Sequence, residues 1–129
     1  MLKLQRKNQT PALVEVFQIT PKRLAGLNND QIRKRPINIG NQTGLLGDWF
    51  SVSGDASDLH HQWSGDLANV GGIGHGMQQG WIQVDGDVGN HLGSRMTGGT
   101  IHVSGSAGRF VGAETVSYTH LTLPTTPYV

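Results

Sequence analysis

The sequence predicts an all-β fold, a right-handed parallel β-helix of glycine-rich coils, preceded by a short lead-in of strand and helix. The main observation is a repeat of about 19 residues, in which segment 81–99 aligns with the segment that starts at Thr100. Composition agrees, because 19 of the 129 residues are glycine and 6% are aromatic, too few large side chains for a thick core. A fixed period of this size is typical of stacked copies of one small unit.

The lead-in is predicted to begin with a strand and a short helix. Valine and isoleucine favour a strand within residues 1–19. Thr20 followed by Pro21 is typical of a helix start, and this helix is expected to end at Gly26.

A second short helix is expected after the first. Asn28 or Asn29 would cap it, and it would run through Ile32 and end before Pro36, because the residue before a proline disfavours helix. The β region is expected to begin at residues 37–41.

Four strand segments follow, and each ends in glycine. They are 50–54, 61–65, 82–86 and 101–105. Because alternate residues of a strand face opposite ways, one face is expected to point inward and the other to solvent. The predicted inward columns are Phe50, His61, Ile82 and Ile101, and Val52, Trp63, Val84 and Val103. The outward column is Ser51, Gln62, Gln83 and His102.

Glycines are predicted at the corners of each coil, where the backbone needs a positive φ that glycine adopts without steric cost. One corner is marked by Gly80, Gly98 and Gly99, and another by Gly86 and Gly105. A third column is expected from Ile73-Gly74, Leu92-Gly93 and Val111-Gly112. Met77 and Met96 are expected to fill gaps in the core.

The chain divides into three segments on this interpretation. They are the lead-in at 1–48, a truncated run of repeats at 49–114, and a tail at 115–129. The tail has no glycine and no repeat register, and we interpret it as aberrant sequence after a native part that ends near Glu114.

The composition excludes several classes of protein. No cysteine is present, so there is no disulfide framework and no thiolate metal site. The first ten residues lack the apolar segment of a signal peptide, and no run approaches the ~18 apolar residues of a membrane helix. We expect a cytoplasmic protein that does not bind a membrane.

Charge is distributed unevenly along the chain. Residues 1–36 contain eight of the ten lysines and arginines but two of the nine acidic residues, so the remainder is acidic. The cluster Arg33–Arg35 is short and has no aromatic residues interleaved, which argues against nucleic-acid binding. A solvated basic face that meets an acidic partner is the favoured interpretation.

No catalytic, cofactor-binding or metal-binding residue is predicted. The loop Gly74–Gly80 resembles a dinucleotide loop, but its last glycine is displaced by one and no helix pattern follows. Segment 71–76 lacks the aspartate of a calcium-binding β-roll repeat. Asp85 and Asp87 flank a corner glycine and are interpreted as turn formers.

The histidines show no metal-binding pattern. His60 and His61 are adjacent and therefore face opposite sides of a strand. His75, His91 and His102 share no column, so surface or hydrogen-bonded roles are favoured. His61 is the exception, because it falls in an inward position.

One further set of motifs occurs in combination: Thr20-Pro21, the leucine- and isoleucine-containing helices, Leu46-Gly47-Asp48 with Phe50, Ser53-Gly54-Asp55 and the G-x-G-M-x-x-G coils. This combination resembles the C subunit of formylmethanofuran dehydrogenase. The resemblance covers about residues 1–114 and looks closest to the bacterial version in the formyltransferase/hydrolase complex. The same coil occurs in the C-terminal β-helix of the glutamate synthase large subunit, but the lead-in favours the formylmethanofuran dehydrogenase family.

The resemblance implies a noncatalytic scaffold subunit in an enzyme complex of one-carbon metabolism, which acts on formylmethanofuran, formate and carbon dioxide. It implies no cofactor on this chain. A molybdopterin or tungstopterin, iron–sulfur clusters and a metal-dependent amidohydrolase site would belong to partner subunits of the complex. The alternatives are a glutamate synthase domain and a stand-alone β-helix protein, such as a carbohydrate-active enzyme. The outward column, with one ionisable residue and no aromatic residue, argues against the stand-alone enzyme.

Overall fold

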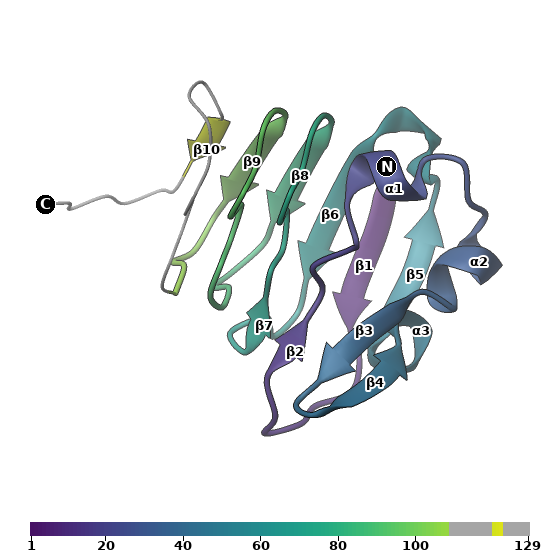
Figure 1. Ribbon diagram of the computed structural model, residues 1–129, viewed down its shortest axis with the longest axis vertical. Helices are drawn as coiled ribbons and strands as arrows, with labels where there is room; N and C mark the ends of the chain where they lie inside the picture. Colours follow the sequence, from purple (N-terminus) through teal and green to yellow (C-terminus); the bar gives the residue numbers. More distant parts are fainter. Residues whose placement is uncertain (109–119, 123–129) are drawn as a thin grey trace, which may run out of the picture.

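The computed structural model describes residues 1–108 and 120–122, which form two β-sheets and short helices around one hydrophobic core (Figure 1). The larger sheet has the order β10-β9-β8-β6-β1-β5. Its strands are β1 (Leu2–Arg6), β5 (Phe50–Gly54), β6 (His60–Ser64), β8 (Trp81–Val84), β9 (Thr100–Val103) and β10 (His120–Thr122). The smaller sheet has the order β4-β3-β2-β7. Its strands are β2 (Val14–Glu15), β3 (Pro36–Ile39), β4 (Gln42–Leu45) and β7 (Val70–Gly71).

The repeat produces a parallel ladder in the larger sheet. Ile82 of β8 pairs with Ile101 of β9, one repeat later, and with His61 of β6 on its other side. This pairing confirms the predicted register of the last three strand segments. β10 pairs with β9 in the same direction and extends the ladder.

The prediction of an all-β, right-handed parallel β-helix is wrong, because the sheets are mixed and helices connect their strands. β1 inserts between the first two predicted coils, parallel to β6 and antiparallel to β5. β5 therefore runs against the other predicted coils, and Phe50 pairs with Arg6 instead of beginning the first column. Val52 is the central residue of β5, and reversing the direction of a strand leaves its central residue in the same row of the sheet. Val52 therefore still lies in its predicted column, because it pairs with Leu4, which pairs with Trp63.

The smaller sheet is mixed as well. β2 is antiparallel to β3 and parallel to β7, and β3 and β4 form an antiparallel hairpin. Single bridges from Leu67 to Val88 and from Val88 to Ala107 continue the coil register on this side of the molecule. The first 45 residues thus contribute strands to both sheets.

Three short helices and one 3-10 turn connect the strands. They are α1 (Pro21–Leu24), α2 (Asn29–Arg33), α3 (Leu46–Trp49) and η1 (Ala56–Asp58). Thr20 and Pro21 begin α1 as predicted, although the Thr20 hydroxyl does not cap the helix. Asn28 caps α2, because its Oδ1 accepts from the Gln31 amide at 2.8 Å and Gln31 Oε1 accepts from the Asn28 amide at 2.9 Å. α2 and α3 pack beside β5 at one end of the larger sheet (Figure 1).

The predicted inward residues are buried. Exposure is at most 6% for Phe50, Val52, His61, Trp63, Ile82, Val84, Ile101 and Val103. The gap-filling and third-column residues are also fully buried where they are described: Ile73, Met77, Leu92 and Met96. Val111, Gly112 and all of the predicted tail except residues 120–122 lie outside the described residues. No helix in the described ranges is long and apolar enough to cross a lipid bilayer.

The predicted corners are occupied by glycines for two different reasons. Gly80 and Gly99, at the turns before β8 and β9, have φ values of +100° and +85°. At the other corner Gly86 also has a positive φ, but Gly105 does not. Glycine is needed at 105 because a Cβ there would overlap the backbone of Gly86 in the preceding coil.

Candidate functional site

His61, the exception among the histidines, is completely buried. It lies between Leu2 of β1 and Ile82 of β8, while its neighbour His60 is exposed on the opposite face. Neither ring nitrogen of His61 has a hydrogen-bond partner among the described residues. Burial lowers the pKa of its imidazole from 6.5 to about 4, and the Asp58 carboxylate offsets this effect only in part. His61 is therefore a neutral core side chain at physiological pH.

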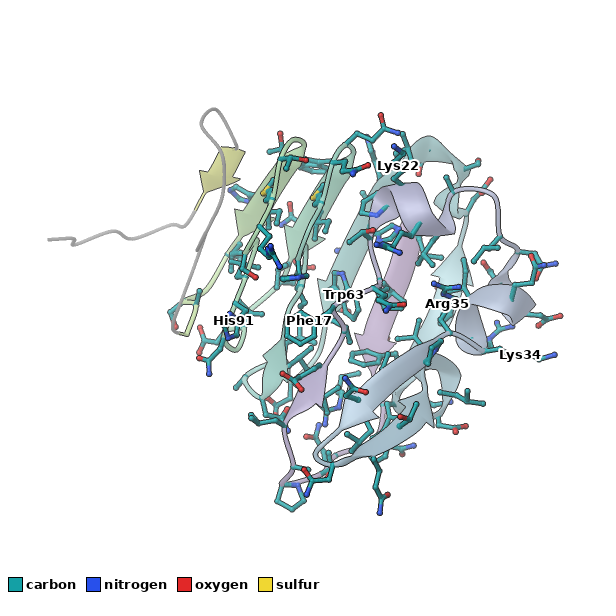
Figure 2. The ribbon with its side chains drawn as sticks, in the orientation of Figure 1. Phe17, Lys22, Lys34, Arg35, Trp63 and His91 are labelled. Atoms are coloured by element: carbon teal, nitrogen blue, oxygen red, sulfur yellow. The ribbon has the colours of Figure 1, made fainter. Side chains whose placement is uncertain are left out.

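Two of the other histidines, His75 and His91, lie against the same aromatic ring. The ring centroids of His75 and His91 lie 4.8 and 6.2 Å from that of Phe17, and Figure 2 shows His91 beside Phe17. Nδ1 of His75 lies 2.6 Å from Oγ of Ser94, one repeat later. His102 is half-buried on the outward face of β9. Within residues 1–108 and 120–122, no three His, Cys, Asp or Glu side chains come close enough together to hold a metal ion.

The paired aspartates join neighbouring coils. Asp85 accepts hydrogen bonds from Gln62 Nε2 at 2.6 Å and from Gln83 Nε2 at 3.1 Å. Asp87 accepts from the amide and the hydroxyl of Ser106 at 2.8 and 3.1 Å. These contacts give the two carboxylates a structural task, which is to link side chains of adjacent strands and coils.

One buried cation was not predicted. Arg6 of β1 is 6% exposed, and its Nη1 donates to Oδ1 of Asn69 at 2.8 Å. The amide of Asn69 in turn donates to the carbonyl oxygens of Thr10 and Ala12 at 2.9 and 2.8 Å. This network holds the segment before β2 against the turn after β6. The signal in the sequence is the alternation of Arg6 with two leucines, which places it on the buried face of its strand.

The loop Gly74–Gly80 leads directly into β8, so it lacks the helix that a dinucleotide-binding loop requires. It packs instead on α1. A Cβ added to Gly80 would come within 2.6 Å of both the Pro21 side chain and the Leu59 carbonyl oxygen, so the approach is close. Lys22 Nζ donates to Gln78 Oε1 at 2.9 Å and links the helix to the loop.

A basic cleft lies between α1 and this loop. Its first part, of about 270 Å³, is lined by Thr20, Lys22, Arg23, Gly76 and Gln78. Its second part, of about 400 Å³, shares Arg23, Gly76 and Gln78 and extends past Phe17 and His75. None of the described residues that line either part is acidic. We call the two parts together the α1 cleft. The sequence does not predict this cleft, because its walls come from segments that are far apart along the chain. The basic charge of the lead-in was the only sequence feature that pointed to a positively charged surface.

The chain has relatives among known proteins, although no family model matches it. It is 37% identical over 95 residues to the C subunit of tungsten-containing formylmethanofuran dehydrogenase 2 from Methanothermobacter marburgensis, over 70% of this chain and 35% of that protein. It is 37% identical over 92 residues to the C subunit of the formyltransferase/hydrolase complex Fhc from Methylorubrum extorquens, over 71% of this chain and 34% of that protein.

A solved structure shows the same relationship. A chain in the crystal structure of the formyltransferase/hydrolase complex (FhcABCD) from Methylorubrum extorquens, in complex with methylofuran, matches with a TM-score of 0.78. The match has 34% sequence identity and covers 86% of this chain and 42% of that chain. The chain spans about a third of the length of the curated relatives that it matches. Sequence and fold therefore agree: this chain is a homologue of the C subunits of formylmethanofuran dehydrogenase and of the formyltransferase/hydrolase complex.

Proposed function

We propose that this chain acts as a noncatalytic scaffold, of the C-subunit type, in an enzyme complex of one-carbon metabolism that acts on formylmethanofuran. The observation that carries the proposal is the likeness to a chain of the FhcABCD complex, at 34% identity and a TM-score of 0.78 over 86% of this chain. Relatives named as tungsten-containing and molybdenum-containing formylmethanofuran dehydrogenase subunits support the same role. Partners of the chain would be the other subunits of such a complex.

The contacts of the titratable side chains support a scaffold role. Asp85 and Asp87 accept hydrogen bonds from Gln62 and Ser106 of neighbouring coils. His61 is held neutral in the core by burial. The aspartate contacts stabilise the fold, and a stack of short strands with a polar outer face is suited to holding other subunits in position.

Cofactors of the complex are proposed to lie on the partner subunits. They are a molybdopterin or tungstopterin, iron–sulfur clusters and a metal-dependent amidohydrolase site. Iron–sulfur clusters are held by cysteine thiolates, and this chain contains no cysteine.

Affinity purification of the tagged chain from its native host tests the proposal, with an untagged strain as control. We expect the partner subunits to copurify. In a complex of the dehydrogenase type, elemental analysis should find tungsten or molybdenum in the complex but not in the chain purified alone. Recovery of the chain without partner subunits would contradict the scaffold role. Stoichiometric tungsten or molybdenum on the isolated chain would contradict the placement of the cofactors.

A further inference from the structure

We propose that the α1 cleft is a docking site for an acidic segment of a partner subunit, whose carboxylates pair with Lys22 and Arg23. This inference rests on the proposed function, because it names the chemistry of a partner within the complex. It adds a surface and a set of contacts that the overall likeness to the homologous subunits does not specify.

The charged side chains in the described lining of the cleft are all basic. Lys22, Arg23 and Arg95 line it, and its described lining includes no aspartate or glutamate. Neither of the two ion pairs found among the described residues involves Lys22 or Arg23. Arg23 is exposed, and within the described part of the chain it forms no salt bridge. Two adjacent cations such as Lys22 and Arg23, with no acidic residue in the described lining of the cleft, create a positive potential that attracts carboxylates and selects against basic partners.

Lys22 is positioned before a partner binds. Lys22 Nζ donates to Gln78 Oε1 at 2.9 Å, which holds the ammonium group across the cleft. An ammonium group has three donors, so two remain for a carboxylate. Arg23 adds a planar guanidinium that can bind a carboxylate through two parallel hydrogen bonds. The close packing of Gly80 on Pro21 fixes the distance between the two walls.

The shape of the cleft fits an extended polypeptide segment. Its two parts join through Arg23, Gly76 and Gln78 and continue past the half-buried ring of Phe17. Figure 2 shows Lys22 on α1 and Phe17 well apart from it along the molecule. A segment with acidic residues at the Lys22 end and an apolar side chain against Phe17 therefore matches both ends.

Charge reversal in the complex tests the proposal. The cleft variant combines Lys22→Glu and Arg23→Glu, and the control combines Lys7→Glu and Lys34→Glu, which make the same change in charge at exposed lysines outside the cleft. Lys34 lies well apart from Lys22, at the C-terminal end of α2 (Figure 2). We expect the cleft variant to bind the partner subunits at least about tenfold more weakly at low salt, and the control to stay within about twofold. High salt should reduce the difference.

Two results would overturn the proposal: equal weakening by both double variants, which indicates general charge attraction, and unchanged binding by the cleft variant. Thermal melts of both variants accompany the binding measurements. If the cleft variant melts well below the control, the combination of Lys22→Gln and Arg23→Gln decides in its place, because it removes the charges without introducing acids into the cleft.

A second measurement separates this proposal from the proposed function. If the wild-type chain does not assemble with the partner subunits, the scaffold role fails and a fluorescent peptide of alternating aspartate and glycine tests the cleft directly. Binding of this peptide, but not of its asparagine version, with loss in the cleft variant, supports the cleft. Absence of binding overturns it. Equal competition by inorganic phosphate would identify a small-anion site and overturn docking of a segment.

Discussion

At the scale of single residues, His61 replaces the isoleucine of the repeat. It occupies the row in which the next two strands of the ladder have Ile82 and Ile101. Burial lowers its pKa from 6.5 to about 4, so the unfolded chain takes up a proton first as the pH falls. The contribution of neutral His61 to stability is therefore complete above pH 6.5 and is lost between pH 6.5 and about 4, a change of roughly 3 kcal/mol.

His61→Ile is expected to remove most of this pH dependence. It should also raise the free energy of unfolding at neutral pH by about 1–2 kcal/mol, because a ring with two buried nitrogen atoms that lack hydrogen-bond partners is replaced by an apolar side chain. Urea unfolding at a series of pH values from neutral to acidic measures both effects, with His60→Gln on the exposed face as the control. Equal pH dependence in the wild type and in His61→Ile would show that other groups carry the acid sensitivity.

At the scale of the elements, the sequence predicts structure well where the signal is local or repeated. The start of α1 at Thr20-Pro21 and the cap of α2 at Asn28 are confirmed, because these signals depend on a few adjacent residues, although the Thr20 hydroxyl forms no capping hydrogen bond. The parallel ladder of β6, β8 and β9 is confirmed, because the alternation of side chains and the repeat period predict the same register. β1 was missed: its alternation of Leu2, Leu4 and Arg6 has no glycine and no repeat, and its pairing depends on strands far along the chain.

The α1 cleft could not be predicted for the same reason. Its link between Lys22 and Gln78 joins residues 56 positions apart, and the packing of α1 on the loop brings them together. What the sequence does show is the excess of basic residues in the lead-in, which predicts the sign of the partner's charge but not its place on the surface.

Two glycines in the loop before β8 allow the free-energy cost of a left-handed backbone to be distinguished from the cost of steric crowding. Gly76 has φ +67° and no atom within 4 Å of an added Cβ, whereas Gly80 has φ +100° and Pro21 at 2.6 Å. We expect Gly76→Ala to lower the free energy of unfolding by about 1 kcal/mol, the cost of a left-handed backbone. Gly80→Ala should lower it by about 3 kcal/mol or more, because α1 must also move.

Gly26→Ala is the control for this pair, because Gly26 has no positive φ and open space around an added Cβ. Chemical denaturation should show that Gly26→Ala changes the free energy of unfolding by no more than about 0.5 kcal/mol. Equal losses in Gly76→Ala and Gly80→Ala would contradict the role assigned to crowding between the loop and α1.

At the scale of the whole molecule, β1 connects strands that run in opposite directions. It pairs antiparallel with β5 and parallel with β6, and Leu4 lies fully buried between Val52 and Trp63. The residues of both sheets belong to one continuous core. Loss of packing at Leu4 should therefore loosen the two sides of the larger sheet together instead of releasing one of them.

Leu4→Ala is expected to lower the free energy of unfolding by about 2–5 kcal/mol, the usual cost of truncating a buried leucine. Leu13→Ala is the matched control, because Leu13 is 59% exposed, and its effect should be within about 0.5 kcal/mol. Tryptophan fluorescence and circular dichroism should report one shared transition. Hydrogen exchange should show that amide protection in β5 and in β8 falls by the same factor. Selective loss of protection in β5 while β8 and β9 keep theirs would instead identify the parallel ladder as a unit that is stable without β1.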